Sequence, residues 1–334
     1  MKAKLELVRE QKLYKLLPGR KKKSPLEASG VTVLNGNAYV IFDSLNLVGK
    51  VNPSLKSGRS NRLIPALSPG TGFEDITFDP QAQRFYLIIE AEEDTDGKYR
   101  SFVVEYDHEF RFQRCTRLSK TFESKNKGFE GLAHLWRGKK EYLLAMCEGN
   151  LCTAATEGGG RIQVFVRTKE ENWQWTHQIA LPDAAEFEDY AAISFHGDRL
   201  AVVSQASSRL WIGDIDRTAH AFAGDGITYR FPDKGYCNVE GVDWLSDDLL
   251  VVVSDRMKAD KQAKRCAAKD QSIHVFRIPE SKALATKKKT PAKKKTTSTK
   301  KASAGKRAQA KKRVASRKKT PVKRKAAAKR KTLA

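Results

Sequence analysis

Short apolar strands bounded by turn residues recur along most of the chain. The most apolar of them read AYVIFD, RFYLIIE, EYLLAMCE, DRLAVVS and DLLVVVSD. Turn-forming residues precede these strands, as in Asn35-Gly36-Asn37, Asp79-Pro80 and Gly197-Asp198. Strands of this length separated by such turns are typical of antiparallel β-hairpins. The pattern therefore predicts an all-β fold.

A second pattern precedes each of these strands, in which an acidic residue directly follows an apolar one. The phrase reads GTGFEDIT at 70–77, NKGFEGLA at 126–133, AEFEDYAA at 185–192 and CNVEGVDW at 237–244. Its glutamates are Glu74, Glu130, Glu188 and Glu240, which lie 56, 58 and 52 residues apart. In EASGVTVLNG, Ser29 takes the place of the glutamate, 45 residues before Glu74. The chain therefore contains five related units.

Further strands complete each unit. The third strands read SFVVEYD, RIQVFVR, RLWIGDI and SIHVFRI, and weaker fourth strands include RFQRCTRLSK and WQWTHQIAL. Four antiparallel strands repeated about every 50 residues are typical of a β-propeller. We predict five blades, with six as the alternative. The fifth unit ends after its third strand, so the segment 3–16 is expected to supply the missing outer strand and close the ring.

The acidic residues are expected to gather at one end of the propeller axis. The recurrent glutamate opens the first strand of a unit, and the second strand is followed by another acid at Asp43, Glu90, Glu148 and Asp255, or by Ser204. Neighbouring antiparallel strands place the start of one beside the end of the other. Both acidic sets should therefore lie at the same end.

Two interpretations of the recurrent acid remain open. Each glutamate could bond backbone amides or a basic neighbour and so tie the blades together. Alternatively, a ring of oxygens could bind a cation, because converging carboxylates raise one another's pKa unless a cation or protons neutralise them. The ring residues are Ser29, Glu74, Glu130, Glu188 and Glu240. An all-oxygen set without His or Cys favours Ca²⁺ as the cofactor.

The FEGLA-type phrase at the head of each unit resembles that of the phytase-like and SdiA-regulated β-propellers. A Ser/Glu ring with one residue per blade is also similar to that of the five-bladed calcium-activated apyrases. This resemblance covers residues 29–280 and implies a central Ca²⁺ bound by Ser29, Glu74, Glu130, Glu188 and Glu240. It also implies a Ca²⁺-dependent phosphoester hydrolase, phytase-like or nucleotidase-like, as an alternative function.

The sequence leaves open whether the protein is an enzyme. Long loops at 90–99, 148–161 and 255–270 are expected at the same end as the acids, where binding residues tend to lie on a rigid scaffold. Arg161, Arg209 and Arg256 follow second strands and are candidates to contact the anion of a phosphorylated small molecule, or they are simply solvated loop charges. The sequence contains no recognised nucleophile or histidine metal motif.

Charge divides the chain into two parts. The sequence has 63 Lys and Arg, 39 Asp and Glu, and a formal net charge of +24. Residues 282–334 contain 23 of the basic residues, no acid and no aromatic residue, so residues 1–281 are nearly neutral. Such a tail cannot bury enough apolar surface to offset its conformational entropy. We therefore predict a propeller at 1–281 and a disordered tail at 282–334.

Basic clusters recur every five to seven residues in this tail. They begin at Lys287, Lys293, Lys300, Lys306, Lys311, Arg317, Lys323 and Lys329. With its intervening Ala, Thr, Ser and Pro, the tail resembles that of histone H1. Spaced cations on a flexible chain bind a phosphate backbone through counterion release, independently of base sequence. DNA or RNA is therefore the expected partner, whereas a solubilising role or another polyanion is the alternative.

The N-terminal segment has charges throughout and lacks an apolar stretch of signal-peptide length. The five cysteines are odd in number and form no CxxC pair, which favours reduced thiols. We expect a cytoplasmic, nucleoid-associated monomer without a membrane partner. The leading hypothesis is a Ca²⁺-binding propeller that acts as a binding module and is tethered to nucleic acid by its tail.

Overall fold

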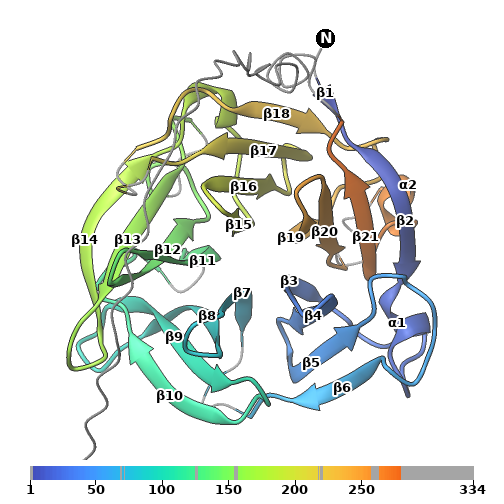
Figure 1. The fold of residues 1–334 in the computed structure, drawn as a ribbon, viewed down its shortest axis with the longest axis horizontal. Coiled ribbons are helices and arrows are strands. Elements are labelled where there is room, and N and C mark those ends of the chain that lie inside the picture. The colour runs from blue at the N-terminus through green and yellow to red at the C-terminus, as the bar shows by residue number, and fades with distance from the viewer. Residues whose placement is uncertain are drawn as a thin grey trace, which may run out of the picture. The chain divides into compact units, whose positions relative to one another are not determined.

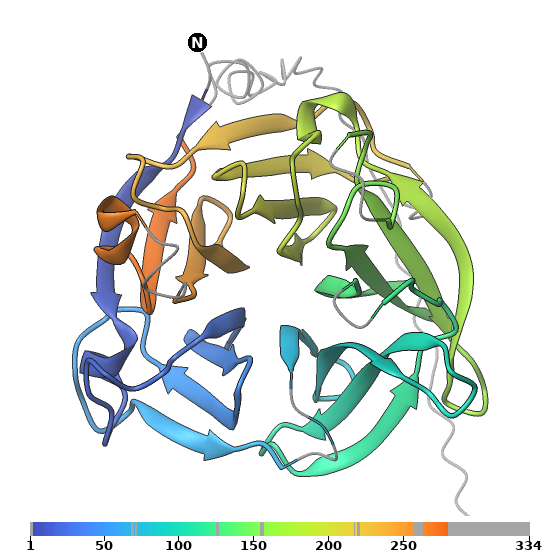
Figure 2. The same ribbon diagram turned by 180° about the vertical axis from the view of Figure 1, so that it is seen from behind.

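The computed structural model describes residues 3–67, 70, 72–124, 127–153, 157–216, 218, 221–256 and 263–279. Within this part of the chain, five antiparallel sheets surround one axis, with a first strand of each sheet nearest the axis (Figures 1 and 2). The predicted five-bladed all-β propeller is therefore confirmed. None of the helices described is long and apolar enough to cross a membrane.

The strands run outward from the axis in chain order within each blade. Blade I contains β3 (Ala28–Leu34), β4 (Asn37–Phe42), β5 (Leu45–Val51) and β6 (Arg62–Pro65). Blade II contains β7 (Phe73–Asp79), β8 (Arg84–Glu93), β9 (Tyr99–Asp107) and β10 (Phe112–Arg117). Blade III contains β11 (Phe129–Arg137), β12 (Lys140–Cys147), β13 (Arg161–Arg167) and β14 (Trp173–Ala180). Blade IV contains β15 (Ala192–His196), β16 (Arg199–Ser204), β17 (Arg209–Asp214) and β18 (Ile227–Arg230). Blade V contains β19 (Val239–Ser246), β20 (Leu249–Ser254) and β21 (Ser272–Arg277).

The N-terminal segment closes the ring in two places. Strand β2 (Glu6–Lys12) pairs antiparallel with β21 and is the fourth strand of blade V, as the sequence predicts. Strand β1 (Ala3–Lys4) instead pairs parallel with β18 and extends blade IV by a fifth strand. The short helix α1 (Leu13–Leu16) follows β2. One continuous segment therefore joins the last two blades and covers both of their outer edges.

The hydrophobic core is divided among the five seams between neighbouring blades. Each seam contains one cluster of buried side chains from two adjacent sheets, such as Leu144 and Met146 of blade III against Val202 and Trp211 of blade IV. Strands buried on both faces have near-continuous apolar runs, which explains the apolar second strands of the sequence. The blades are therefore held together by packing at the seams, which leaves the axis for polar groups.

Candidate functional site

The recurrent acid occupies a β-bulge on the first strand of the blade. In four blades the register of the first and second strands skips one residue, and the skipped residues are Ser29, Glu74, Glu130 and Glu240. A bulge inserts an unpaired residue and re-aims its side chain. The repeated sequence phrase therefore encodes a bulge at one end of the axis. We call this end, where β3, β7, β11 and β19 begin, the mouth.

The glycine after the acid lets neighbouring first strands approach each other. A Cβ added to Gly241 would lie 2.9 Å from the Cα of Gly30 in the adjacent blade, and one added to Gly131 would lie 3.0 Å from the backbone nitrogen of Ile193. Real Cβ atoms do not approach backbone so closely, so a side chain at these positions would push the blades apart. The apolar-acid-glycine phrase thus combines a core residue, a mouth carboxylate and a contact between strands.

Glu74 and Glu130 of neighbouring blades share a hydrogen bond between their carboxyl groups. Burial, the charge of Glu130 and the charge of Asp43 raise the pKa of Glu74 well above its usual value. Burial and the charge of Glu148 raise the pKa of Glu130 to about 8, although its hydrogen bond with Glu74 opposes this shift. Carboxyl groups that hold protons near neutral pH indicate a high density of negative charge.

Glu240 completes this group from blade V. Its pKa is raised well above the usual value by burial and by the charges of Asp255 and Glu130, while Gln205 donates a hydrogen bond to its carboxylate. Burial also raises the pKa of Asp255 to about 7. Ser29 is buried, and its hydroxyl donates to the carbonyl of Phe73 in blade II. The structure therefore brings together the first-strand residues of four blades.

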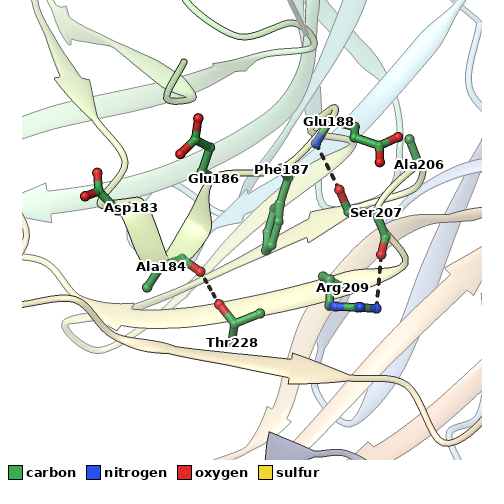
Figure 3. A pocket seen from close by; sticks show the side chains of 9 residues that line it. All are labelled: Asp183, Ala184, Glu186, Phe187, Glu188, Ala206, Ser207, Arg209 and Thr228. Carbon is green, nitrogen blue, oxygen red and sulfur yellow. Dashed lines mark hydrogen bonds between the residues drawn. The ribbon is translucent and has the colours of Figure 1, made fainter. Parts of the chain in front are cut away.

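Glu188 does not join this group, which corrects the sequence alignment of blade IV. Strand β15 has no bulge, and its pairing places Ala191 where the other blades have Ser29, Glu74, Glu130 and Glu240. Glu188 is exposed and lines a pocket of about 560 Å³ beside Phe187 and Arg209 (Figure 3). The sequence misleads here because FED at 187–189 copies the phrase three residues too early.

Asp189 supplies the carboxylate of blade IV instead. Its side chain accepts a hydrogen bond of 2.6 Å from the Ser204 hydroxyl and one of 3.0 Å from the backbone nitrogen of Ala206. Burial raises its pKa, and its charge in turn raises the pKa of Glu130 and Glu240. The acid that directly follows Glu188 in the sequence could have indicated Asp189 as the carboxylate of blade IV. The sequence alone does not reveal the strand register of β15, which decides between the two.

The second acidic set lies around the same mouth. Asp43 is exposed, with its pKa raised by partial desolvation and by Glu27, whereas Glu90 and Glu148 are half-buried. The charges of Asp43 and Glu90 raise the pKa of Glu74, and the charge of Asp255 raises that of Glu240. Lys127 pairs with Glu148 at 3.0 Å. The two acidic sets therefore interact electrostatically.

Two disulfide bonds fix loops on the mouth side of the propeller. Cys147 at the end of β12 pairs with Cys152, and Cys237 before β19 pairs with Cys266 in the short helix α2 (Lys264–Ala267). The expectation of reduced thiols is therefore wrong for these four residues, whereas Cys115 is a free thiol. Spacings of 5 and 29 residues match no motif, and only the folded loops bring these pairs together.

Two further carboxylates near the axis were not singled out from the sequence. Asp75 accepts hydrogen bonds of 2.8 Å from the backbone nitrogens of Ile76 and Leu132, and Ile193 also donates to it. Asp75 thus links blades II, III and IV. We call Asp75 and its counterpart in blade V, Asp243, the interior carboxylates.

Asp243 makes the same kind of link on the other side of the axis. It accepts hydrogen bonds from the backbone and side chain of blade I and from Ser194 of blade IV. Burial raises the pKa of both interior carboxylates, and their hydrogen bonds oppose the shift. Their role is structural because their oxygens are occupied by donors of the protein itself.

The three arginines proposed as anion contacts have different surroundings. Arg161 donates to the carbonyls of Gly159 and Gly160, at 2.8 and 3.1 Å, and so fixes its own loop. Arg256 is half-buried and directly precedes residues that are not described. Arg209 donates to the carbonyl of Ser207, as Figure 3 shows, and to that of Ser208. Arg209 lines two pockets, one beside Glu188 and one at the boundary of blades IV and V.

Arg209 also lines a basic cleft of about 410 Å³ between blades IV and V. Its basic side chains come from four separate segments of the chain and are Lys4, Arg209, Arg230, Lys234 and Arg265. Asp233 is the acid of this cleft, and its carboxylate accepts a 2.7 Å bond from the backbone nitrogen of Gly235. The excess of positive charge makes the cleft suitable for an anion such as phosphate.

The residues proposed to contact nucleic acid, from Lys287 to Lys329, lie outside the described part of the chain. The predicted disorder of 282–334 is likewise outside it.

Comparisons with known proteins show similarity of fold. No family model matches the chain, and no curated protein matches its sequence. Among solved structures, glutaminyl cyclase from Myxococcus xanthus has a TM-score of 0.48 at 10% identity, with 84% of this chain and 100% of that chain covered. Regucalcin from Agrobacterium tumefaciens, titled a calcium-binding protein, has a TM-score of 0.47 at 9% identity, with coverages of 83% and 96%. A PQQ-bound aldose sugar dehydrogenase from Streptomyces coelicolor has a TM-score of 0.45 at 13% identity, with coverages of 82% and 97%.

Proposed function

We propose that the protein is a binding module in which the propeller binds a divalent cation at its mouth and the tail holds the molecule on nucleic acid. The proposal of a cation at the mouth rests on the group formed by Glu74, Glu130 and Glu240. Each of their pKa values is raised by burial and by other carboxylates. A cation that replaces the protons of this group would remove the repulsion.

The donor set at the mouth fits Ca²⁺ by its chemistry. It offers carboxylate and hydroxyl oxygens from the bulges of blades I, II, III and V, with Asp189 from blade IV, and Ca²⁺ takes six to eight such ligands in flexible geometry. Glu74 and Glu130 share a hydrogen bond, but among the described residues no three carboxylates of the mouth come within 4.8 Å of one another. Cation binding would therefore include side-chain rotation at the mouth.

The tail supports the second part of the proposal through its composition alone. Residues 282–334 combine 23 basic residues with no acid, whereas the rest of the chain is nearly neutral. Binding through phosphates predicts a steep loss of affinity with salt, about 10³-fold or more between 50 and 200 mM if six or more phosphates are contacted. DNA and RNA both offer this backbone.

Truncation tests the tether. A chain ending at residue 281 retains all five blades and the closing strand β2, so it should keep the circular dichroism spectrum and melting temperature of the full chain. It should lose binding to a labelled 30-base-pair duplex and to single-stranded RNA in a fluorescence anisotropy titration. A full-length variant with Gln at the basic positions of the tail is the matched control for length. Undiminished binding by both variants would contradict the tether.

A phosphoester hydrolase that depends on the same cation is a second candidate, which the basic cleft favours. In such an enzyme the cation polarises a phosphate and activates water, while basic side chains stabilise the developing charge. Arg209 and Arg230 line the cleft on the blade next to Glu240. A phosphorylated small molecule is the corresponding ligand.

Turnover separates the two candidates. Hydrolysis of p-nitrophenyl phosphate and of nucleoside triphosphates should be measured with Ca²⁺ and with chelator, for the full chain and for Arg209→Gln. Turnover that requires Ca²⁺ and falls in Arg209→Gln supports the hydrolase. A melting temperature that rises with Ca²⁺ without turnover supports the binding module.

We propose that the protein is a monomer. We also propose that it is located in the cytoplasm, associated with the nucleoid. The disulfides bear on this proposal because such bonds persist in oxidising compartments and are rare in the cytosol. Thiol alkylation of protein taken directly from cells tests it. One reactive cysteine per chain indicates an oxidising compartment, and five indicate that the disulfides are reduced in place.

A further inference from the structure

A second cluster of metal-ligating side chains lies in the seam between blades II and III. Asp79 is the last residue of β7, His134 lies on β11 and Glu141 on β12. One ligand atom from each of the three lies within 4.8 Å of the others. His134 Nε2 is 3.2 Å from Glu141 Oε1 and 3.8 Å from Asp79 Oδ2. Their side chains are 0%, 1% and 10% exposed for Asp79, His134 and Glu141.

Neighbouring side chains hold both carboxylates in place. Asp79 Oδ1 accepts hydrogen bonds from Trp136 Nε1 at 3.0 Å and from the backbone nitrogen of Gln81 at 2.8 Å. The Tyr86 hydroxyl donates to Glu141 Oε1 at 2.7 Å. Metal-ligating carboxylates are commonly fixed by such outer hydrogen bonds, which set their orientation.

One carboxylate oxygen in this cluster has no hydrogen-bond donor among the described residues. Asp79 Oδ2 is buried and accepts no hydrogen bond from the residues described, although it faces His134 Nε2 across 3.8 Å. A buried carboxylate oxygen without a partner is costly to a fold. His134 already lies within hydrogen-bond distance of Glu141, so its Nε2 does not satisfy Asp79 as well. A cation among the three side chains would be a partner for this oxygen.

A cavity lies beside the cluster and is lined by one of its members, His134. About 260 Å³ of open volume lies at the end of the axis opposite the mouth, where it is lined by His134, by Thr77, Phe78 and Pro80 around Asp79, and by His196. Three protein ligands are one fewer than the four of a closed structural zinc site, so the fourth position would be filled by water.

We propose that Asp79, His134 and Glu141 form a binding site for a transition-metal ion, with Zn²⁺ as the ion that the donor set fits best. Imidazole and carboxylate ligands suit Zn²⁺, whereas Ca²⁺ takes oxygen alone. Ligands of a tetrahedral ion at 2.0 to 2.1 Å lie about 3.3 Å apart, which is close to the observed 3.2 and 3.8 Å from His134, while the Asp79 and Glu141 oxygens, within 4.8 Å of each other, would move inward to bind the ion. The propeller thus has different cation chemistry at its two ends.

Sequence spacing could not reveal this site. His134 and Glu141 come together because β11 and β12 are paired, and Asp79 joins them from the next blade, 55 residues earlier. The site is independent of the proposed function, because none of its residues lies at the mouth or in the tail. A zinc ion here would also tie blade II to blade III.

The test is zinc binding by the full chain in excess Ca²⁺, which occupies sites made of oxygen alone. Equilibrium dialysis with metal analysis should give one Zn²⁺ per chain, and Co²⁺ should give the visible absorption of a tetrahedral N/O site without a thiolate band from Cys115. His134→Gln and Glu141→Gln, which remove direct ligands, should each weaken Zn²⁺ binding by more than about 100-fold, the upper end of the loss for an outer hydrogen-bond partner. Tyr86→Phe, which removes only an outer hydrogen bond, should weaken it by about 10-fold.

His196→Gln is the matched control. His196 lines the same cavity and contacts a single carboxylate, Asp247, at 2.6 Å, so its loss should leave the zinc stoichiometry and affinity unchanged. If His134→Gln does not fold, Asp79→Asn and Glu141→Gln, which preserve side-chain shape, give the same comparison. The proposal is overturned if the wild-type chain binds no Zn²⁺ under these conditions, or if the Asp79, His134 and Glu141 variants bind it as tightly as the wild type.

Discussion

Glu74 and Asp75 are adjacent carboxylates on one strand, yet they have opposite surroundings. Glu74 lies in the bulge of β7 and shares a hydrogen bond with another carboxyl group, that of Glu130. Asp75 points into the structure, where backbone nitrogens of three blades donate to it. Burial raises the pKa of both residues, but only Asp75 has donors that compensate for the lost water.

This difference in hydrogen-bond donors distinguishes carboxylates that stabilise the fold from carboxylates whose charge the protein itself does not compensate. The interior carboxylates Asp75 and Asp243 satisfy backbone amides and so join blades. Glu74, Glu130 and Glu240 instead repel one another, which lowers stability unless protons or a cation are present. A fold does not keep such repulsion for its own stability, so the mouth is where function is to be sought.

The largest expected effect comes from removing an interior carboxylate. Asp75→Ala leaves the backbone nitrogens of Leu132 and Ile193 buried without an acceptor, and each such group costs about 1 to 3 kcal/mol. We expect the free energy of unfolding to fall by about 3 kcal/mol or more, as measured by urea denaturation. Glu74→Gln, one residue away, should not destabilise the Ca²⁺-free protein. Equal losses in both variants would remove the distinction drawn between the two carboxylates.

The sequence predicted the fold well because its strongest signals are local. Alternating turns and apolar strands identify hairpins, and the fifth unit's missing strand pointed to closure by the N-terminal segment. The parallel pairing of β1 with β18 was not foreseen, because two residues carry no periodicity of their own. The disulfides were missed for a related reason, since Cys237 meets Cys266 only after α2 folds back beside the start of blade V.

The candidate site was predicted less completely. The mouth residues of blades I, II, III and V follow from the repeated phrase, because a bulge needs one extra residue; a glycine follows that residue in blades I, III and V, whereas Asp75 follows it in blade II. Blade IV breaks the phrase, so Glu188 was chosen where register places Ala191 and Asp189 contributes the carboxylate. Asp75 and the Asp79 cluster depend on contacts between blades, which no single unit of the sequence encodes.

The next largest effect is the loss of cation stabilisation at the mouth. A ligand that binds only the folded state stabilises it by about 2.7 kcal/mol at 100 times its dissociation constant. Wild-type protein should therefore melt several degrees higher in Ca²⁺ than in chelator, and Glu130→Gln should lose most of this shift. Differential scanning calorimetry measures both. Glu188→Gln is the control, because Glu188 lies outside the ring, and an equal loss in both variants would contradict a cation site at Glu130.

A smaller effect is expected from opening the disulfide beside the mouth. Cys147 and Cys152 close a loop of about six residues, for which the chain-entropy relation gives about 2 kcal/mol. Replacing both by Ser should lower the free energy of unfolding by about this amount. Because Glu148 follows Cys147 directly, the same variant should weaken Ca²⁺ binding in a calorimetric titration, whereas the interior carboxylates should be unaffected. Unchanged Ca²⁺ affinity would show that this loop does not shape the mouth.

The smallest expected effect is a change of stability between pH 7 and 8. The folded-state pKa of Glu130 is about 8, well above its value of 4.5 in the unfolded chain, so the folded protein holds more protons in this range and loses stability as pH rises. The loss is at most about 1 kcal/mol per pH unit for one proton. His274, whose pKa is lowered by burial, acts in the opposite direction but only below about 6.5, the usual pKa of histidine. Melting temperatures in chelator should therefore fall from pH 7 to 8 in the wild type and change less in Glu130→Gln. With saturating Ca²⁺ the wild-type slope should disappear, because the cation replaces the proton, and a slope that persists in Ca²⁺ would place the titrating group away from the mouth.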